Sequence, residues 1–463
     1  MACPLLSLHL LASAGTEVHA HATDTLLPKG FFLALGLIYL AALALDRLAE
    51  RLRLPAAAAV LLLGLALHDI TTGFQHIRPE QVSTLGRISL ALLIFYAGLG
   101  TDLRRIRGRV GAGLRLATVG VLITLACMGL LLMAFATPMA DGLRLVGGPG
   151  LPLAAAWLTA TCLTPTDTAA LEGLLCNLGH SISAPVRHLL QFEAALSTVV
   201  SLLCFSFLAG AFQLHPHGDH LALHTEVVHS MPAQVLLVLR HLLAGVIAGL
   251  LVGAAAPPLI DRLVRSESQL LLVAISLAFA AYGLGQALGR GGLLAVFGAG
   301  MMLCNGRFRF ARFDQGALDR ALHPFNTAAE ITVLLLLGLS VAPADLITVL
   351  PLGLLLALAL PLARLLGVWM ALPGRSFPNR ERMVVAGCGL RGAVPLGLAL
   401  ATAEELPHLQ GILQPGAGEL ARHLLAVIFL VVLLNQLLQT GWMHATMRWL
   451  TRSPVAPLAE EAP

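Results

Sequence analysis

Long apolar runs follow one another along the chain, separated by short polar interruptions. Thirteen runs are candidates for helices that cross about 30 Å of hydrocarbon, and the second and ninth are short. Their approximate ranges are 29–46, 54–69, 85–101, 111–137, 151–175, 186–212, 234–258, 269–288, 291–305, 325–342, 347–372, 383–402 and 421–446. The pattern predicts an all-α polytopic membrane protein with about thirteen transmembrane helices.

Composition supports this class. Of the 463 residues, 57% are hydrophobic and only 12% are charged, with a mean hydropathy of +0.84, which argues against a soluble protein of this length. Few aromatic residues and many Leu, Ala and Gly favour close helix packing over a β-barrel. The seven cysteines form no CxxC pair and no metal-ligand spacing with histidine, so we expect no cofactor and no resident metal.

Basic residues are unevenly distributed between the connections. If the N-terminus is extracytoplasmic, the inner connections hold nineteen Lys and Arg residues and the outer ones seven. This imbalance fits the positive-inside rule. It predicts an extracytoplasmic tail at 1–28, a transmembrane domain at 29–446 and a short cytoplasmic tail at 447–463. The first residues lack the basic region of a secretory signal, and a cleaved signal remains the alternative to a tail.

One outer connection, 214–229, is rich in histidine and has no Lys or Arg. A zinc-binding or pH-sensing role is one interpretation. The irregular histidine spacing favours a solvated loop.

Two pairs of segments indicate an internal repeat with inverted topology. The run LLIFYAGLGTDLRRI (92–106) corresponds to LLLLGLSVAPADLI (334–347), and TATCLTPTDTAALEG (159–173) corresponds to AGCGLRGAVPLGLAL (386–400). Each pair is seven spans apart, an odd number, so its members cross the membrane in opposite directions. Inverted repeats of this kind are typical of secondary transporters, with the site near the midplane on broken helices.

The fifth and twelfth spans are predicted to be discontinuous. Pro165 removes a backbone donor in the fifth span, and Gly387, Gly389 and Gly392 loosen the twelfth. Broken backbone at membrane depth is tolerated only inside protein or beside a water-filled cavity. The ends of the half-helices attract ions of opposite sign, so charged residues at the breaks are candidates for the site.

Five ionisable residues lie inside the predicted spans, and each needs a partner or a function: Asp167, Glu193, Glu330, Arg364 and Arg391. Asp167 either caps its own half-helix or binds a cation or a proton, and the oxygens of Thr164, Thr166 and Thr168 favour the second interpretation. Glu193 is predicted to form a structural ion pair with Arg391. Glu330 and Arg364 lie on neighbouring spans. Glu330 is close to the start of its span, so a capping role explains it equally well.

Three stretches resemble the sodium–proton exchanger branch of the monovalent cation–proton antiporter superfamily. TPTDTAAL (164–171) resembles the family's broken-helix Thr-Asp motif, FEAALSTVVSL (192–202) its Glu-bearing core helix, and GLRGAVPLGLAL (389–400) its arginine helix. FYAGLGTDLRRIR (95–107) is a fourth, weaker match. The resemblance implies a homodimer whose protomers each contain a mobile core with two crossed discontinuous helices, and a scaffold that makes the dimer contact.

The resemblance also suggests which helices and residues do what. Core helices are expected at about 85–212 and 325–402, and scaffold helices at about 29–69, 234–305 and 421–446. Thr166 and Asp167 would bind the cation, while Glu193 would pair with Arg391. A bacterial inner membrane is the expected location, with membrane lipids and the transported ions as partners and no nucleic acid.

The sequence departs from the family pattern on the core helix. The family usually places Ser directly after the Glu, and Asn-Asp four and five residues after it, and that Asp is its main carrier of the proton or cation. Here these positions hold Ala194, Ser197 and Thr198. Threonine does not titrate at physiological pH. Any proton must therefore be carried by Asp167, or by Glu193 released from its partner.

Three functions remain open. The leading hypothesis is a secondary transporter, not an enzyme, that exchanges Na⁺ or K⁺ for H⁺ by alternating access. Its cation and proton site would comprise Asp167, Thr166, Thr164, Thr198 and Ser197. The second is the same fold carrying an organic or anionic solute, because a carboxylate is missing while Arg391 is kept. The third is a sensor or structural homologue that does not transport.

Overall fold

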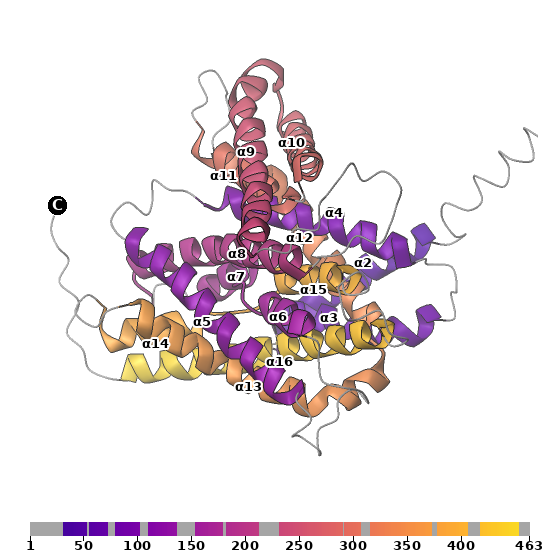
Figure 1. The fold of residues 1–463 in the computed structure, drawn as a ribbon, viewed down its shortest axis with the longest axis vertical. Helices are drawn as coiled ribbons and strands as arrows, with labels where there is room; N and C mark the ends of the chain where they lie inside the picture. The colour runs from indigo at the N-terminus through magenta and orange to yellow at the C-terminus, as the bar shows by residue number, and fades with distance from the viewer. Residues whose placement is uncertain are drawn as a thin grey trace, which may run out of the picture.

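The computed structural model describes residues 31–52, 55–72, 79–101, 110–136, 153–178, 182–212, 231–289, 291–306, 315–372, 377–405 and 417–452. These ranges contain helices and no strand (Figure 1). The first eight helices are α2 (Phe31–Leu52), α3 (Ala56–Thr72), α4 (Pro79–Leu99), α5 (Val110–Ala136), α6 (Leu153–Cys162), α7 (Thr168–Leu178), α8 (Ala184–Phe212) and α9 (Met231–Leu263). The others are α10 (Glu267–Gly289), α11 (Gly292–Asn305), α12 (Gln315–Ser340), α13 (Pro343–Ala371), α14 (Asn379–Gly387), α15 (Ala393–Glu405) and α16 (Ala417–Arg452).

Each of the thirteen predicted spans corresponds to one helix or to a pair of short helices. The pairs are α6 with α7 and α14 with α15, so the fifth and twelfth spans are discontinuous as predicted. Seven of the described helices are long and apolar enough to cross a membrane: α5, α8, α9, α10, α12, α13 and α16. Shorter apolar helices include α3 and α11, the two spans predicted to be short. The all-α membrane architecture is confirmed.

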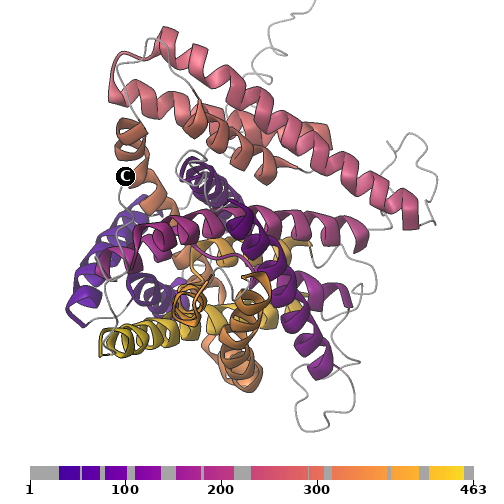
Figure 2. The ribbon, with the colours of Figure 1, turned by 90° about the vertical axis from the view of Figure 1, so that its left-hand side faces the viewer.

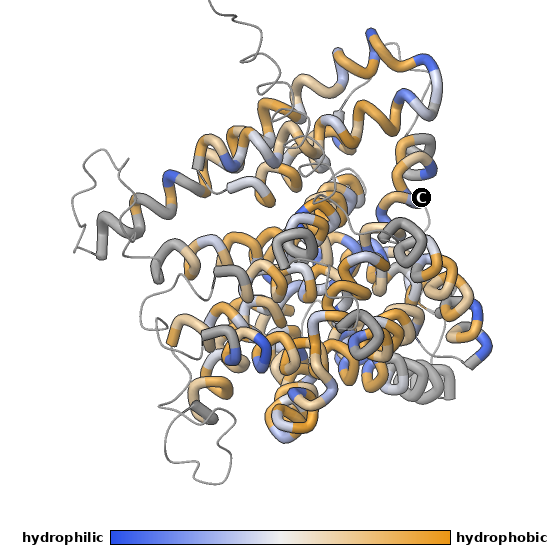
Figure 3. Tube along the Cα trace, turned by 90° about the vertical axis from the view of Figure 1, so that its right-hand side faces the viewer, coloured by the Kyte–Doolittle hydropathy of each residue, from blue (hydrophilic) through white to orange (hydrophobic). Residues whose placement is uncertain are grey.

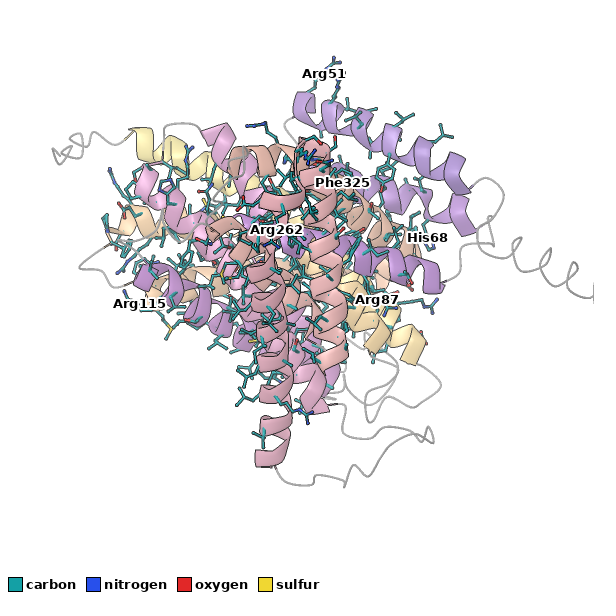
Figure 4. All side chains as sticks on the ribbon, turned by 90° about the horizontal axis from the view of Figure 1, so that it is seen from above. Arg51, His68, Arg87, Arg115, Arg262 and Phe325 are labelled. Carbon is teal, nitrogen blue, oxygen red and sulfur yellow. The ribbon has the colours of Figure 1, made fainter. Side chains whose placement is uncertain are left out.

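Hydropathy follows the helices as a membrane protein requires. Hydrophobic residues run along their lengths, and hydrophilic residues gather at several helix ends, including the turn between α9 and α10 (Figure 3). The labelled arginines of Figure 4, Arg51, Arg87, Arg115 and Arg262, are all exposed. Arginines inside the bundle are therefore a separate class and need local partners.

Glycine contacts make the inverted repeat visible in the packing. α3 packs on α12 with Gly64 against Gly338, and α4 packs on α11 with Gly98 against Gly300. In the repeat, α3 is equivalent to α11 and α4 to α12, so these two contacts are copies of each other. A Cβ added to Gly64 would lie 2.9 Å from Gly338 Cα, and one on Gly98 would lie 3.2 Å from Gly300 Cα. Small residues let helix backbones approach this closely in membranes.

We expect Gly338→Ala to force α3 and α12 apart. The new Cβ would lie 2.7 Å from both Gly64 Cα and Leu61 O, and backbone cannot move aside as a side chain can. Overpacking of this kind costs about 1–3 kcal/mol. The measurement is thermal unfolding of the purified protein. Gly283→Ala on α10 is the matched control, since nothing lies within 4 Å of its added Cβ. Equal stability of the two variants would contradict the close approach.

The helices form two groups that meet around the discontinuous spans. α9, α10 and α11 stand together at one end of the molecule, whereas α5, α13, α14 and α16 lie at the other (Figures 1 and 2). α4 and α12 pack on each other and on α15, while α12 also packs on α3 and α4 on α11. They therefore lie between the two groups.

The last helix lies beside the second break. α16, which the family resemblance places among the scaffold helices, packs mainly on α13, α15 and α14. The reason is the repeat itself, because α16 is the second copy of α8 and so takes the equivalent place beside the second break. α16 also continues to Arg452, so the helix includes the first residues of the predicted tail at 447–463. Residues 1–28, the histidine-rich connection 214–229 and residues 453–463 lie outside the described residues.

Candidate functional site

The two breaks lie against each other in the centre of the protein. α6 ends at Cys162 and α7 begins at Thr168, while α14 ends at Gly387 and α15 begins at Ala393. The Asp167 amide donates to Leu390 O at 3.0 Å, which joins the extended segments directly. Side chains from α8, α13 and α16 complete the polar centre.

Asp167 lies where two half-helices begin. Its Oδ1 accepts a hydrogen bond from the Ala170 amide in the first turn of α7 at 3.1 Å, and its Oδ2 accepts one from the Val394 amide in the first turn of α15 at 3.4 Å. The positive ends of both half-helices therefore converge on one buried carboxylate, which is 3% exposed. The absence of a side chain at Gly392 makes space for the Asp167 carboxylate, since a Cβ there would collide with Oδ2. Asp167 therefore caps its own half-helix, as one of the two interpretations of the sequence expected, and it caps α15 as well.

Glu193 pairs with a different arginine from the one predicted. Both of its carboxylate oxygens accept from Arg364 of α13, at 2.7 Å from Nη1 and 2.8 Å from Nη2. The predicted ion pair with Arg391 is therefore corrected. The backbone explains the choice, because Gly389 in the second break leaves space through which the Arg364 side chain passes, 3.0 Å from where a Cβ would stand. The pair is almost fully buried, with exposures of 3% and 0%.

Arg391 binds neutral oxygens of the other break. Its Nη1 donates to Thr164 O at 2.6 Å and to Thr166 Oγ1 at 3.2 Å. Thr164 lies just beyond the C-terminal end of α6, so the guanidinium sits at the negative end of that half-helix. Asp167 and Arg391 thus compensate opposite helix ends, as the sequence predicted for charges at the breaks.

The predicted hydroxyl residues surround the first break. The Thr166 amide donates to Ser197 Oγ at 3.2 Å, and Thr198 Oγ1 donates to Thr166 O at 3.5 Å and to Ala194 O at 3.1 Å. Thr164 Oγ1 donates to Ser201 Oγ at 2.8 Å. All five predicted binding residues are therefore near one another, and Ser201 is an addition that its position one turn after Ser197 would have suggested.

Two amides on α16 escaped the sequence interpretation. Asn435 Oδ1 accepts from the Arg391 amide at 3.2 Å, and Gln436 Nε2 donates to Arg391 O at 2.8 Å. Both side chains are buried, at 0% and 2% exposed. A signal was present, because two adjacent amides inside the apolar run VVLLNQLLQ are expensive in a membrane helix unless they have partners.

Known proteins resemble this chain over most of its length. A family model described as "Sodium/hydrogen exchanger, transmembrane" matches residues 36–449. The K(+)/H(+) antiporter NhaP of Alkalimonas amylolytica is 25% identical over 422 residues, covering 90% of this chain and 66% of that protein. The K(+)/H(+) antiporter NhaP2 of Shewanella oneidensis is 27% identical over 414 residues, covering 88% and 65%. The chain therefore spans about two thirds of the length of these relatives.

A solved structure shows the same fold. The sodium proton antiporter MjNhaP1 from Methanocaldococcus jannaschii at pH 8 superposes with a TM-score of 0.74 and 21% sequence identity, covering 91% of this chain and 99% of the other. This likeness concerns the fold. Since the family model covers nearly the whole membrane region, the chain is an integral membrane protein that belongs to the sodium/hydrogen exchanger family.

Proposed function

We propose that this protein exchanges a monovalent cation, Na⁺ or K⁺, for protons by alternating access, with Asp167 as the shared carboxylate. The observation that carries the proposal is the place of Asp167, a buried carboxylate at which two half-helices begin. Glu193 is committed to Arg364 through both of its oxygens. Thr198, at the position of the family's usual Asp, does not titrate. Asp167 is therefore the carboxylate best placed to take up a proton and a cation in turn.

The surrounding oxygens support a cation at this carboxylate. Ser197 and Thr198 of α8 place hydroxyls beside the break that contains Asp167, whereas Arg391 would have to release Thr164 O and Thr166 Oγ1 before these could bind a cation. Oxygen ligands of this kind suit hard cations. One carboxylate loaded alternately by H⁺ and by a cation gives electroneutral one-for-one exchange. The relatives named as K(+)/H(+) and Na(+)/H(+) antiporters make both ions reasonable substrates.

The same proposal covers the setting of the protein. We place the protein in a bacterial inner membrane. The arginine distribution supports an N-terminus on the outer side and a C-terminus on the cytoplasmic side. The family resemblance supports a homodimer with the scaffold helices at the contact.

Proteoliposomes test the proposal directly. With an acidic interior and a pH-sensitive dye, adding Na⁺ or K⁺ outside should dissipate the pH gradient, and adding choline should not. The response should persist when the membrane potential is clamped, because the exchange is electroneutral. Protein-free liposomes are the control. An unresponsive pH gradient with every alkali cation would reject cation–proton exchange for this chain.

A second candidate, transport of an anionic solute, rests on Arg391. In the described part of the chain its hydrogen-bond partners are a carbonyl and a hydroxyl rather than a carboxylate. A buried guanidinium with neutral partners is a reasonable anchor for an anion. A thermal-shift screen separates the candidates, because this one requires stabilisation by an anionic solute and none by Na⁺ or K⁺.

A further inference from the structure

The two breaks are held by equivalent pairs of neighbouring side chains. In the first half, Ser197 accepts from the Thr166 amide and Thr198 donates to the Thr166 carbonyl. In the second half, Asn435 accepts from the Arg391 amide and Gln436 donates to the Arg391 carbonyl. In each half, two consecutive residues of one long helix satisfy both backbone groups of one residue in the break. Each break would otherwise bury an unsatisfied amide and carbonyl, which is costly without water.

The equivalence follows the inverted repeat. α8 and α16 are the sixth and thirteenth spans, so they are related by the same seven-span offset as the two discontinuous helices. Asn435-Gln436 is therefore the second-half copy of the place that holds Ser197-Thr198 in the first half. The side chains differ, with two hydroxyl residues on α8 and two longer amides on α16, while the backbone bonds are the same.

We propose that Asn435 and Gln436 are positioning residues of the ion site, which fix the second break so that Asp167 and Arg391 are correctly placed. Arg391 precedes Gly392 and Val394 on the chain, and Val394 supplies the second amide that Asp167 accepts. Holding the Arg391 backbone from both sides therefore fixes that donor. It also fixes the Cα of Arg391, from which the guanidinium reaches Thr164 O. Asn435 and Gln436 act through the backbone of the break and do not bind the ion themselves.

Gln436→Leu tests this role, because it removes the donor to Arg391 O while keeping the residue of similar size. We expect the apparent KM for the transported cation to rise about three- to tenfold, the effect of losing roughly one net hydrogen bond. We also expect faster hydrogen–deuterium exchange of backbone amides in residues 388–394. Both effects should be confined to the second break, with the exchange of α8 and α13 unchanged.

Gln439→Leu is the matched control. Gln439 lies on the same helix within one turn of Gln436 and is equally buried at 2% exposed, and its Oε1 accepts no hydrogen bond from the residues that the structure describes. Replacing it removes a buried amide of the same size that does not hold the break. We expect its KM and the exchange of residues 388–394 to match those of the unmodified protein. Asn435→Ala is a second test that can be used if Gln436→Leu fails to fold. It removes the acceptor of the Arg391 amide, and we expect the same rise in KM and the same faster exchange of residues 388–394.

The two readouts separate this inference from the function on which its transport part rests. The KM comparison depends on the proposed cation–proton exchange, whereas hydrogen exchange needs no transport. Faster exchange at 388–394 in Gln436→Leu or Asn435→Ala, and not in Gln439→Leu, supports the positioning role even for a protein that carries another solute. Unchanged exchange in the first two variants, or the same change in all three, overturns it. Where cation transport is measurable, faster hydrogen exchange at 388–394 together with an unchanged KM for the cation also overturns the positioning role, because Asn435 and Gln436 would then be structural only.

Discussion

Asp167→Asn is expected to abolish cation-dependent dissipation of a pH gradient in proteoliposomes while leaving the protein folded. Asparagine keeps the side-chain oxygen that caps α7, and Asn and Asp are about equally good at this position. The bond from the Ala170 amide therefore survives. What is lost is the acceptor of the Val394 amide, because Asn has only one side-chain oxygen, together with the negative charge and the ability to take up a proton, and the last two are the properties that the proposed exchange requires.

Folding and function are separated by measuring both on the same preparation. The thermal unfolding midpoint should fall less in Asp167→Asn, which keeps the bond from the Ala170 amide, than in Asp167→Ala, which loses both bonds and about 1 kcal/mol with the α7 cap alone. Glu419→Gln is the control for charge removal, since Glu419 is exposed in the first turn of α16, away from the breaks. It should transport normally. Full exchange activity in Asp167→Asn would show that another group carries the proton.

Much of this architecture could be predicted because the membrane imposes a strong one-dimensional pattern. Each span needs a long apolar run, and helix breakers such as Pro165 and Gly392 are visible against that background. These features depend on residues near one another in the sequence. The contacts of Ser197 and Thr198 with Thr166 do not, and only the family resemblance led us to expect them.

The choice of partner for Glu193 depends on distances that the sequence does not contain. Arg364 on α13 and Arg391 in the second break are both buried, and either side chain is long enough to reach a carboxylate on α8. Packing decides between them, since the missing side chain of Gly389 opens a path for Arg364. Arg391 is held instead by the backbone bonds from α16. The contact of α16 with the second break is likewise not visible in the sequence, because the equivalence of α16 to α8 appears only when both helices are seen beside their breaks.

The identity of that partner gives the second large expected effect. Glu193→Leu should destabilise the protein by about 3–5 kcal/mol, because it leaves the Arg364 guanidinium buried without its carboxylate. Adding Arg364→Leu to that variant should recover most of the loss, since replacing both members of a buried pair with apolar residues is often neutral. Thermal unfolding midpoints of the two single variants and the double variant, in one detergent, measure the coupling.

The second arginine supplies the comparison that makes this cycle decisive. Glu193→Leu combined with Arg391→Leu should recover nothing, because Arg391 holds Thr164 O and Thr166 Oγ1 and its removal leaves Arg364 unpaired. The double variant should be at least as unstable as Glu193→Leu alone. Recovery with Arg391→Leu and not with Arg364→Leu would instead restore the pairing predicted from the sequence. Glu193 would then be paired with Arg391 instead of Arg364, and Asp167 would still be the proposed carrier of the proton.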